Sequence, residues 1–145
     1  MLKVILMLVM MLTTLISETE FAEPKPSIMN LRQIVVPMAS GDPKEMHRII
    51  STVNNMMKFY GPENVEFVVV AYGQGLKSLL KDGDKEVRVR VEALMTYPVE
   101  FVACGNTMKT LKLTKKDLLD DIEYATAGLV EIVERQLRGY TYIYP

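Results

Sequence analysis

Hydrophobic residues along this chain gather in short continuous runs that alternate with helical patterns. Three runs are typical of strands buried on both faces, namely QIVVPMAS at 33–40, VEFVVVAY at 65–72 and VEFVAC at 99–104. Pro37 lies within the first run, and because proline cannot donate a ladder hydrogen bond, it predicts a strand end or a bulge there. Two weaker strands are expected at residues 122–126 and 141–144.

The clearest helical pattern follows the first strand, over residues 42–61. Asp42 suits the N-cap, Pro43 the first helical position, and Glu45 a capping box. Gly61 is a natural terminator. Apolar residues recur every three or four positions, which predicts that one face is Met46, Ile49, Ile50, Val53 and Met57.

The segment KEVRVRVEALMTY at residues 85–97 has two periodicities. Val87, Val89 and Val91 alternate as in a strand, whereas Val87, Val91, Leu94 and Met95 share a helical face. We predict a helix, because parallel strands on either side need a crossover. Another helix is expected at 128–139, with Leu129, Ile132, Val133 and Leu137 on one face. Shorter helical segments are expected at 76–82, near Thr107 and after Thr114.

Alternating strands and helices predict an α/β fold, a three-layer α/β/α single domain around a mainly parallel five-stranded sheet. The carboxyl ends of parallel strands lie along one edge, where such folds bind ligands. Four glycine-bearing segments are placed there, Ser40–Asp42, Tyr72–Gly75, Cys104–Thr107 and Thr126–Gly128. A backbone that contains glycine can approach a ligand or a neighbouring loop closely.

The first 22 residues read as a segment separate from this domain. An apolar run from Val4 to Ile16 follows Lys3, and it is about as long as the core of a signal peptide but short for a membrane span. We predict an export signal cut after Ser17 or Ala22, and hence a periplasmic protein. An uncleaved membrane anchor is the alternative. Residues 23–30 are a predicted linker, and residues 31–145 the domain.

Composition narrows the function classes. The 145 residues carry a formal charge of −1, and removal of residues 1–22 leaves equal numbers of acidic and basic residues, so a nucleic-acid partner is not expected. The loops SGD and GQG match no phosphate-binding motif. His47 and Cys104 are the only histidine and cysteine, and one of each makes no convincing metal site. We therefore expect no metal and no organic cofactor.

Cys104 is the strongest candidate for chemistry, because it ends a buried strand just before helical turns. Unpaired amides at a helix start favour a thiolate, which suits nucleophilic attack or sulfur transfer through a persulfide. Asn106 and Thr107 could hydrogen-bond a sulfur anion. Free cysteine is also among the most buried residue types, so a packing role stays open. Candidate binding residues around it are Gly105, Asn106, Thr107, Gly73 and Gly75.

The order of QIVVPMASGDPKEMHRIISTVNNM, VEFVVVAYGQGLKSLL, VEFVACGNTMKTL and AGLVEIVERQLRGYTYIYP resembles the DsrE/DsrF-like proteins over roughly residues 31–145. These include sulfur-relay subunits of bacterial sulfur oxidation and of tRNA thiolation. The resemblance implies a parallel α/β/α fold, a homotrimer or hexamer, and a persulfide on the cysteine at the position of Cys104. Unlike the relay subunits, this chain has only Lys109 as a basic residue in the helix after that cysteine, and it carries an apparent export signal.

The function that follows from this resemblance is a sulfur carrier or sulfurtransferase with Cys104 as the persulfide site, acting with a sulfur donor or acceptor protein. A non-catalytic, oligomeric binding or assembly module with Cys104 buried is the alternative. A third interpretation is a small-molecule binder that uses the glycine-rich edge. Contact with a membrane is expected only through an uncleaved N-terminal segment.

Overall fold

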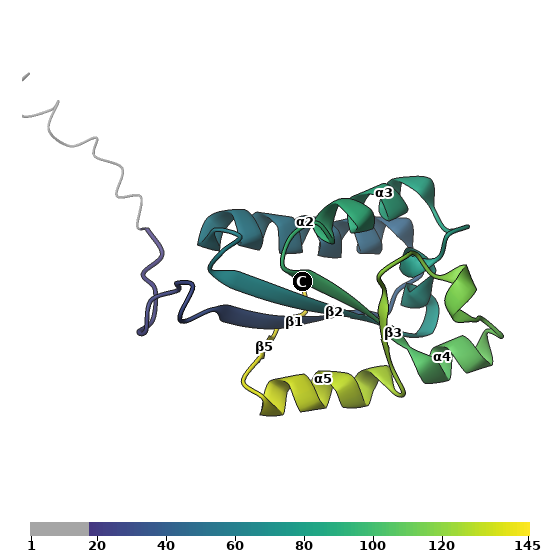
Figure 1. Ribbon diagram of the computed structural model, residues 1–145. Helices are drawn as coiled ribbons and strands as arrows, with labels where there is room; N and C mark the ends of the chain where they lie inside the picture. The colour runs from purple at the N-terminus through teal and green to yellow at the C-terminus, as the bar shows by residue number, and fades with distance from the viewer. Residues whose placement is uncertain (1–17) are drawn as a thin grey trace, which may run out of the picture.

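A computed structural model describes residues 18–145, so most of the expected leader lies outside the described residues. Five parallel strands form one sheet in the order β4-β3-β2-β1-β5 (Figure 1). Their bounds are β1 Arg32–Met38, β2 Val65–Ala71, β3 Val99–Cys104, β4 Glu123–Ala125 and β5 Thr141–Tyr142. The predicted α/β domain with a five-stranded parallel sheet is confirmed. Within residues 18–145, no helix has both the length and the apolar character to cross a bilayer.

Helices cover the two faces of the sheet unequally. The helices α2 (Pro43–Tyr60) and α3 (Lys85–Leu94) pack on one face, and α5 (Gly128–Leu137) lies on the other (Figure 1). The large core cluster lies under α2 and α3, whereas the cluster under α5 has five buried residues, Val35, Val68, Val70, Val102 and Ile132. The helix α4 (Gly105–Thr110) and the 3₁₀ segments η2 (Gly73–Leu79) and η3 (Lys115–Asp117) complete the fold.

The helix α2 forms as its sequence predicts, apart from one capping contact. The Asp42 carboxylate accepts a hydrogen bond from the Lys44 amide at 3.0 Å, and Gly61 ends the helix with a φ of 85°. All five predicted core residues of this helix are buried. The predicted capping box is wrong, because the Glu45 carboxylate pairs with Arg48 at 2.6 Å instead of reaching back to the cap.

Pro37 lies inside β1 without a bulge, because no strand of the described residues pairs with its side of β1 at that level. Alternate residues of β1 bond to opposite neighbours, since the Met38 carbonyl accepts from β2 and the Val35 carbonyl from the chain after β5. The pairing of β5 covers only Ile34 and Val35. The missing amide of Pro37 therefore faces a stretch of edge where no ladder hydrogen bond is needed.

The ambiguous segment at residues 85–97 is a helix over Lys85–Leu94, as predicted, with Val87, Val91 and Leu94 buried. Two other boundaries differ from expectation. The short helix expected at 76–82 begins earlier, so that it includes the GQG loop. The last strand stops at Tyr142 rather than Tyr144, because only two of its residues pair with β1.

Residues 18–145 leave one face of α5 uncovered. Of the four apolar residues predicted to share a helical face, Ile132 alone is buried. The other three and the neighbouring Val130 are each more than half exposed, and we call this set the outer face of α5: Leu129, Val130, Val133 and Leu137. The side of α5 that meets the sheet is instead formed by Gly128, Ile132 and the half-buried Arg135.

Candidate functional site

The carboxyl edge of the sheet brings the predicted glycine-bearing segments into contact. The backbone amide of Gly128 donates a hydrogen bond to Cys104 Sγ at 3.2 Å. The amide of Gly73 donates to Thr107 Oγ1 at 3.0 Å, which joins the loop after β2 to the helix after β3. The amide of Asn106 donates to the Thr126 carbonyl oxygen at 3.0 Å. Three separate segments thus converge at the end of β3, where Cys104 lies.

Cys104 is the last residue of β3, and its side chain is largely enclosed. Its exposed fraction is 6%, so the thiol is neither freely accessible nor completely sealed. The close approach of α5 depends on the absence of a side chain at Gly128. A Cβ there would lie 3.1 Å from Cys104 Cβ and 3.3 Å from both Tyr72 Cβ and Val70 Cγ1. A larger residue would push the amide away from the sulfur.

Two opposing effects set the acidity of the thiol. Burial raises the pKa of Cys104, but hydrogen bonds from the Thr107 hydroxyl and from the amides of Thr107, Gly128 and Asn106 outweigh it, so the pKa is lower than usual. Among residues 18–145, the Gly128 amide is the one donor whose contact with the sulfur meets the distance and angle criteria of a hydrogen bond. The Asn106 amide already serves Thr126, so its contribution is the smallest. The balance favours the thiolate.

The Thr107 hydroxyl contacts Gly73 and also affects the acidity of Cys104. Because the Gly73 amide donates to Thr107 Oγ1, one lone pair of that oxygen is occupied and the hydroxyl hydrogen is free to point elsewhere. The hydroxyl is one of the groups that lower the pKa of Cys104. Gly73 supports this arrangement with a φ of 54°, a left-handed conformation that favours glycine.

The other predicted binding residues, Gly105, Asn106 and Gly75, have different places in the structure. Gly105 and Asn106 form the first turn of α4, and the Asn106 side chain is exposed. Gly75 is buried, and its amide donates to the carbonyls of Ala39 and Tyr72. A Cβ at Gly75 would lie 1.9 Å from the Met38 carbonyl oxygen, so this glycine serves close packing of η2 against β1.

Gly128, which contacts the sulfur, and Tyr72, which lies beside Gly128, were not selected from the sequence as site residues. Gly128 belonged to a predicted edge segment, but only the return of α5 along the sheet brings its amide to Cys104. Tyr72 lies beside Gly128 at the end of β2. Its pKa is raised by burial and by the nearby Tyr142 and Tyr144, so the closing YTYIY segment also borders this region.

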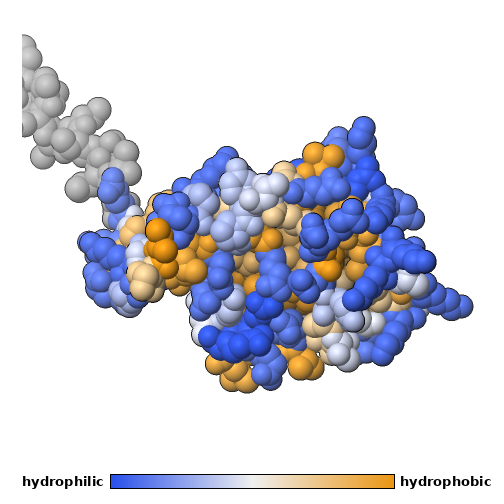
Figure 2. All heavy atoms as spheres, viewed as in Figure 1, coloured by the Kyte–Doolittle hydropathy of each residue, from blue (hydrophilic) through white to orange (hydrophobic). Residues whose placement is uncertain are grey.

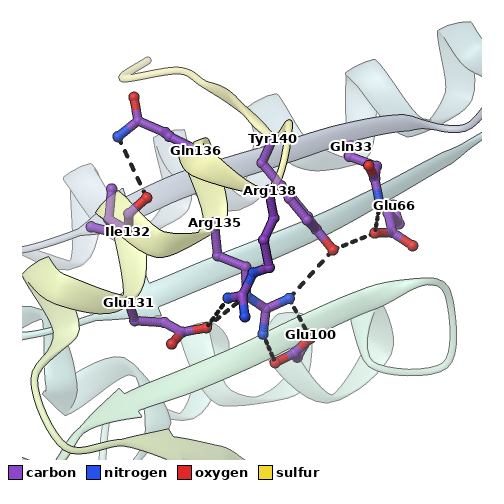
Figure 3. A network of polar contacts seen from close by, with 9 residues as sticks. All are labelled: Gln33, Glu66, Glu100, Glu131, Ile132, Arg135, Gln136, Arg138 and Tyr140. Carbon is purple, nitrogen blue, oxygen red and sulfur yellow. Dashed lines mark hydrogen bonds and ion pairs between the residues drawn. The ribbon is translucent and has the colours of Figure 1, made fainter.

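A polar network holds the other end of α5 to the sheet (Figure 3). The Arg135 guanidinium binds both carboxylate oxygens of Glu100, at 2.7 and 3.2 Å, and Nε donates to Glu131 at 2.6 Å. It also donates to the Tyr140 hydroxyl at 3.3 Å, and that hydroxyl donates to Glu66. The network fixes the position of α5 on the sheet. That position in turn places the Gly128 amide, at the start of α5, beside the thiol.

A groove of about 630 Å³ opens beside α5 on the same face of the sheet. Val102, Ala125 and Val130 are among its lining residues. Val102 precedes Cys104 by two residues on β3. Ala125 on β4 is the register partner of Cys104. The groove therefore lies beside the end of β3, although Cys104 itself does not line it.

His47 lies away from this site and links two helices. Its Nδ1 lies 2.7 Å from an Arg90 guanidinium nitrogen, and the same guanidinium donates to Ser51 at 2.8 Å. In the described part of the chain, no three side chains of His, Cys, Asp or Glu lie close enough to hold a metal ion.

The fold and the site define a class of protein, a three-layer parallel α/β domain with a hydrogen-bonded thiol at the end of its third strand. The family profile described as "DsrE/DsrF-like family" matches residues 33–145. The chain belongs to this family. No curated protein matches it.

Solved structures share the fold, among them these two. MTH1491, a protein of unknown function from Methanobacterium thermoautotrophicum, is 32% identical with a TM-score of 0.72, over 77% of this chain and 97% of that one. The YchN protein from E. coli has a TM-score of 0.67 at 14% identity, over 79% of this chain and 100% of that one. The second similarity is one of fold alone.

Replacement of Thr107 by Val should raise the pKa of the Cys104 thiol, because it removes a hydroxyl that stabilises the thiolate while nearly preserving volume. The rate of alkylation by iodoacetamide, followed against pH, should have its midpoint at higher pH in Thr107→Val than in the wild type. Thr110→Val is the matched control, since that hydroxyl binds the Asn106 carbonyl instead of the sulfur. Equal midpoints in all three proteins would contradict the assignment.

Replacement of Arg135 by Leu should destabilise the fold by about 2 kcal/mol, because it leaves the half-buried Glu100 carboxylate without its partner. Urea unfolding measures this loss. Arg138→Leu should change stability by less than about 0.5 kcal/mol, since Arg138 is exposed and meets only Glu131, at 3.4 Å. A loss of the same size in both variants would show that the network does not fix α5.

Proposed function

We propose that this protein is a sulfur carrier that holds a persulfide on Cys104. The observation that carries the proposal is the hydrogen bond from the Gly128 amide to Cys104 Sγ, in a member of the DsrE/DsrF-like family. A buried cysteine that served packing alone would need no donor directed at its sulfur. The lowered pKa of the thiol, caused by hydrogen bonds that outweigh burial, supports the same role.

The reaction is an exchange between sulfur atoms. The Cys104 thiolate attacks the outer sulfur of a donor persulfide, R–S–SH, so that a new S–S bond forms as the donor S–S bond breaks. The donor leaves as the thiolate R–S⁻, and Cys104 becomes Cys104–S–SH. The donor thiol is reduced and Cys104 is oxidised by the same amount, so no external oxidant is needed. Transfer to an acceptor thiol reverses these steps.

The groups around the sulfur have defined roles in this exchange. The amide of Gly128 and the hydroxyl of Thr107 stabilise the attacking thiolate and then the persulfide anion. Enclosure of the side chain limits access of larger oxidants to a thiol that would otherwise be consumed in an oxidising compartment. The groove beside α5 is lined by Val102, two residues before Cys104 on β3, and it is the route by which a donor would approach.

Incubation with a small persulfide donor, followed by mass spectrometry, should show one added sulfur atom on Cys104. The addition should be lost in Cys104→Ser and after treatment with a reductant. Thr107→Val should load more slowly at neutral pH, while Thr110→Val loads like the wild type. An unmodified thiol in a folded protein, under conditions in which a free cysteine peptide becomes modified, would exclude the carrier role.

The uncovered outer face of α5 favours a second candidate, an assembly module built from copies of this chain. Four apolar side chains stand in a row on one helix, and water-exposed apolar surface of this kind marks an interaction site. A homotrimer or hexamer would bury this row. Assembly and sulfur carriage are compatible, because the apolar row lies on the outer face of α5, whereas Cys104 meets the Gly128 amide on the side toward the sheet.

Val133→Asp combined with Leu137→Asp should convert the assembly to monomers, because charged residues in a buried interface cost several kcal/mol each. Size-exclusion chromatography with light scattering measures the mass. Val89→Asp, which changes an exposed apolar residue on α3, should leave the mass unchanged. A wild-type protein that is monomeric at micromolar concentration would refute this candidate and leave the persulfide test unaffected.

A further inference from the structure

The edge of the sheet opposite Cys104 has a second exposed apolar surface, separate from the outer face of α5. The exposed fractions are 72% at Ile28, 88% at Met29, 57% at Phe59 and 38% at Leu31. We call these four residues the N-terminal patch. Figure 2 shows hydrophobic surface at this end of the molecule, next to the first described residues.

Ile28 and Met29 form the tip of a tight, hydrogen-bonded turn. Backbone hydrogen bonds join Ser27 and Asn30 in both directions, at 3.2 and 2.9 Å, and the Asn30 side chain donates to the Ser27 hydroxyl. The two central positions of such a turn usually carry Gly, Asn, Asp or Pro. Here they carry two large apolar side chains that contact water, although turn formation itself requires neither.

The turn is held against the domain rather than extended from it. The Phe21 ring packs on Phe59 and Tyr60, with ring centroids 5.6 and 5.7 Å apart. The Arg32 guanidinium donates to the Ala22 carbonyl at 2.7 Å. These contacts fix residues 21–32 to the end of α2 and the start of β1, so the apolar tip has a set direction.

The chain outside the structure enters at this same edge. Residues 1–17 include the apolar run from Val4 to Ile16, and they join the described chain at Glu18, three residues before Phe21. A retained anchor would bring a bilayer to the N-terminal patch. A cleaved leader would leave the patch in the mature chain, since all four residues follow Ala22.

We propose that the N-terminal patch is a membrane-contacting surface, which inserts Ile28 and Met29 into the bilayer interface. The adjoining segments hold three acidic residues, Glu18, Glu20 and Glu23, and three basic ones, Lys25, Arg32 and Lys58, so no net positive charge attracts anionic lipid. Binding comes from apolar insertion, which zwitterionic lipid supports and salt does not weaken. This surface acts whether or not Cys104 carries sulfur.

This contact sets the orientation of the protein on the membrane. The patch adjoins the start of β1, whereas Cys104 ends β3 at the opposite edge. The seven residues of β1 span about 20 Å. The thiol therefore faces away from the bilayer, toward partners in the aqueous phase.

The chain contains no tryptophan, so single-tryptophan variants of the full chain report depth directly. Phosphatidylcholine vesicles carrying brominated acyl chains should quench the fluorescence of Met29→Trp and shift its emission to the blue. Asn106→Trp, at the Cys104 edge, should remain unquenched. Vesicle-bound protein with an unquenched tryptophan at position 29 would overturn the proposal, as would a failure to bind vesicles at all.

A second measurement separates the patch from the leader and from a second copy. Ile28→Asp combined with Met29→Asp should weaken partitioning onto these vesicles by about fivefold or more, with no effect of salt. Val89→Asp, on α3, should bind like the wild type. Unchanged partitioning in the double variant would overturn the proposal. A blue shift of Met29→Trp that depends on protein concentration without lipid would also overturn it, in favour of self-association.

Discussion

The placement of α5 across the sheet is the constraint on which the site depends. At one end, Arg135 binds the Glu100 carboxylate on β3, and at the other, the Gly128 amide reaches Cys104 Sγ at 3.2 Å. Both contacts involve the same strand, so α5 and β3 are joined at both of their ends. A shift of the helix along the sheet would break a charged pair and remove a donor from the thiol together.

The site balances two requirements that oppose each other. Enclosure protects a thiol from oxidation, but it also raises the pKa and so disfavours the reactive anion. Hydrogen bonds from Gly128 and Thr107 restore the acidity without opening the site to water. The same close packing explains why position 128 is a glycine, since a Cβ there would separate α5 from the sulfur.

The two faces of the sheet differ from each other, and so do the two edges at which its strands begin and end. Across the sheet, one face is covered by α2 and α3, while the α5 face retains a groove and a row of exposed apolar residues. Along the strands, one edge holds the thiol and the other holds the apolar turn at Ile28 and Met29. The enclosed thiol, the groove and the exposed apolar turn thus occupy separate parts of the molecule.

The sequence by itself determined the architecture, because local patterns report burial. Apolar runs gave the bounds of β3, and helical spacing gave the five buried residues of α2 and the helical state of residues 85–94. The position of Cys104 at a strand end, and so at the edge of the sheet, followed from the same reasoning. Only tertiary structure decided which atoms meet that sulfur. The Gly128 amide is 24 residues away along the chain, and no periodicity encodes such a contact. The outer face of α5 likewise resembles a buried face in sequence, since hydrophobic spacing shows that a face is apolar but not what covers it.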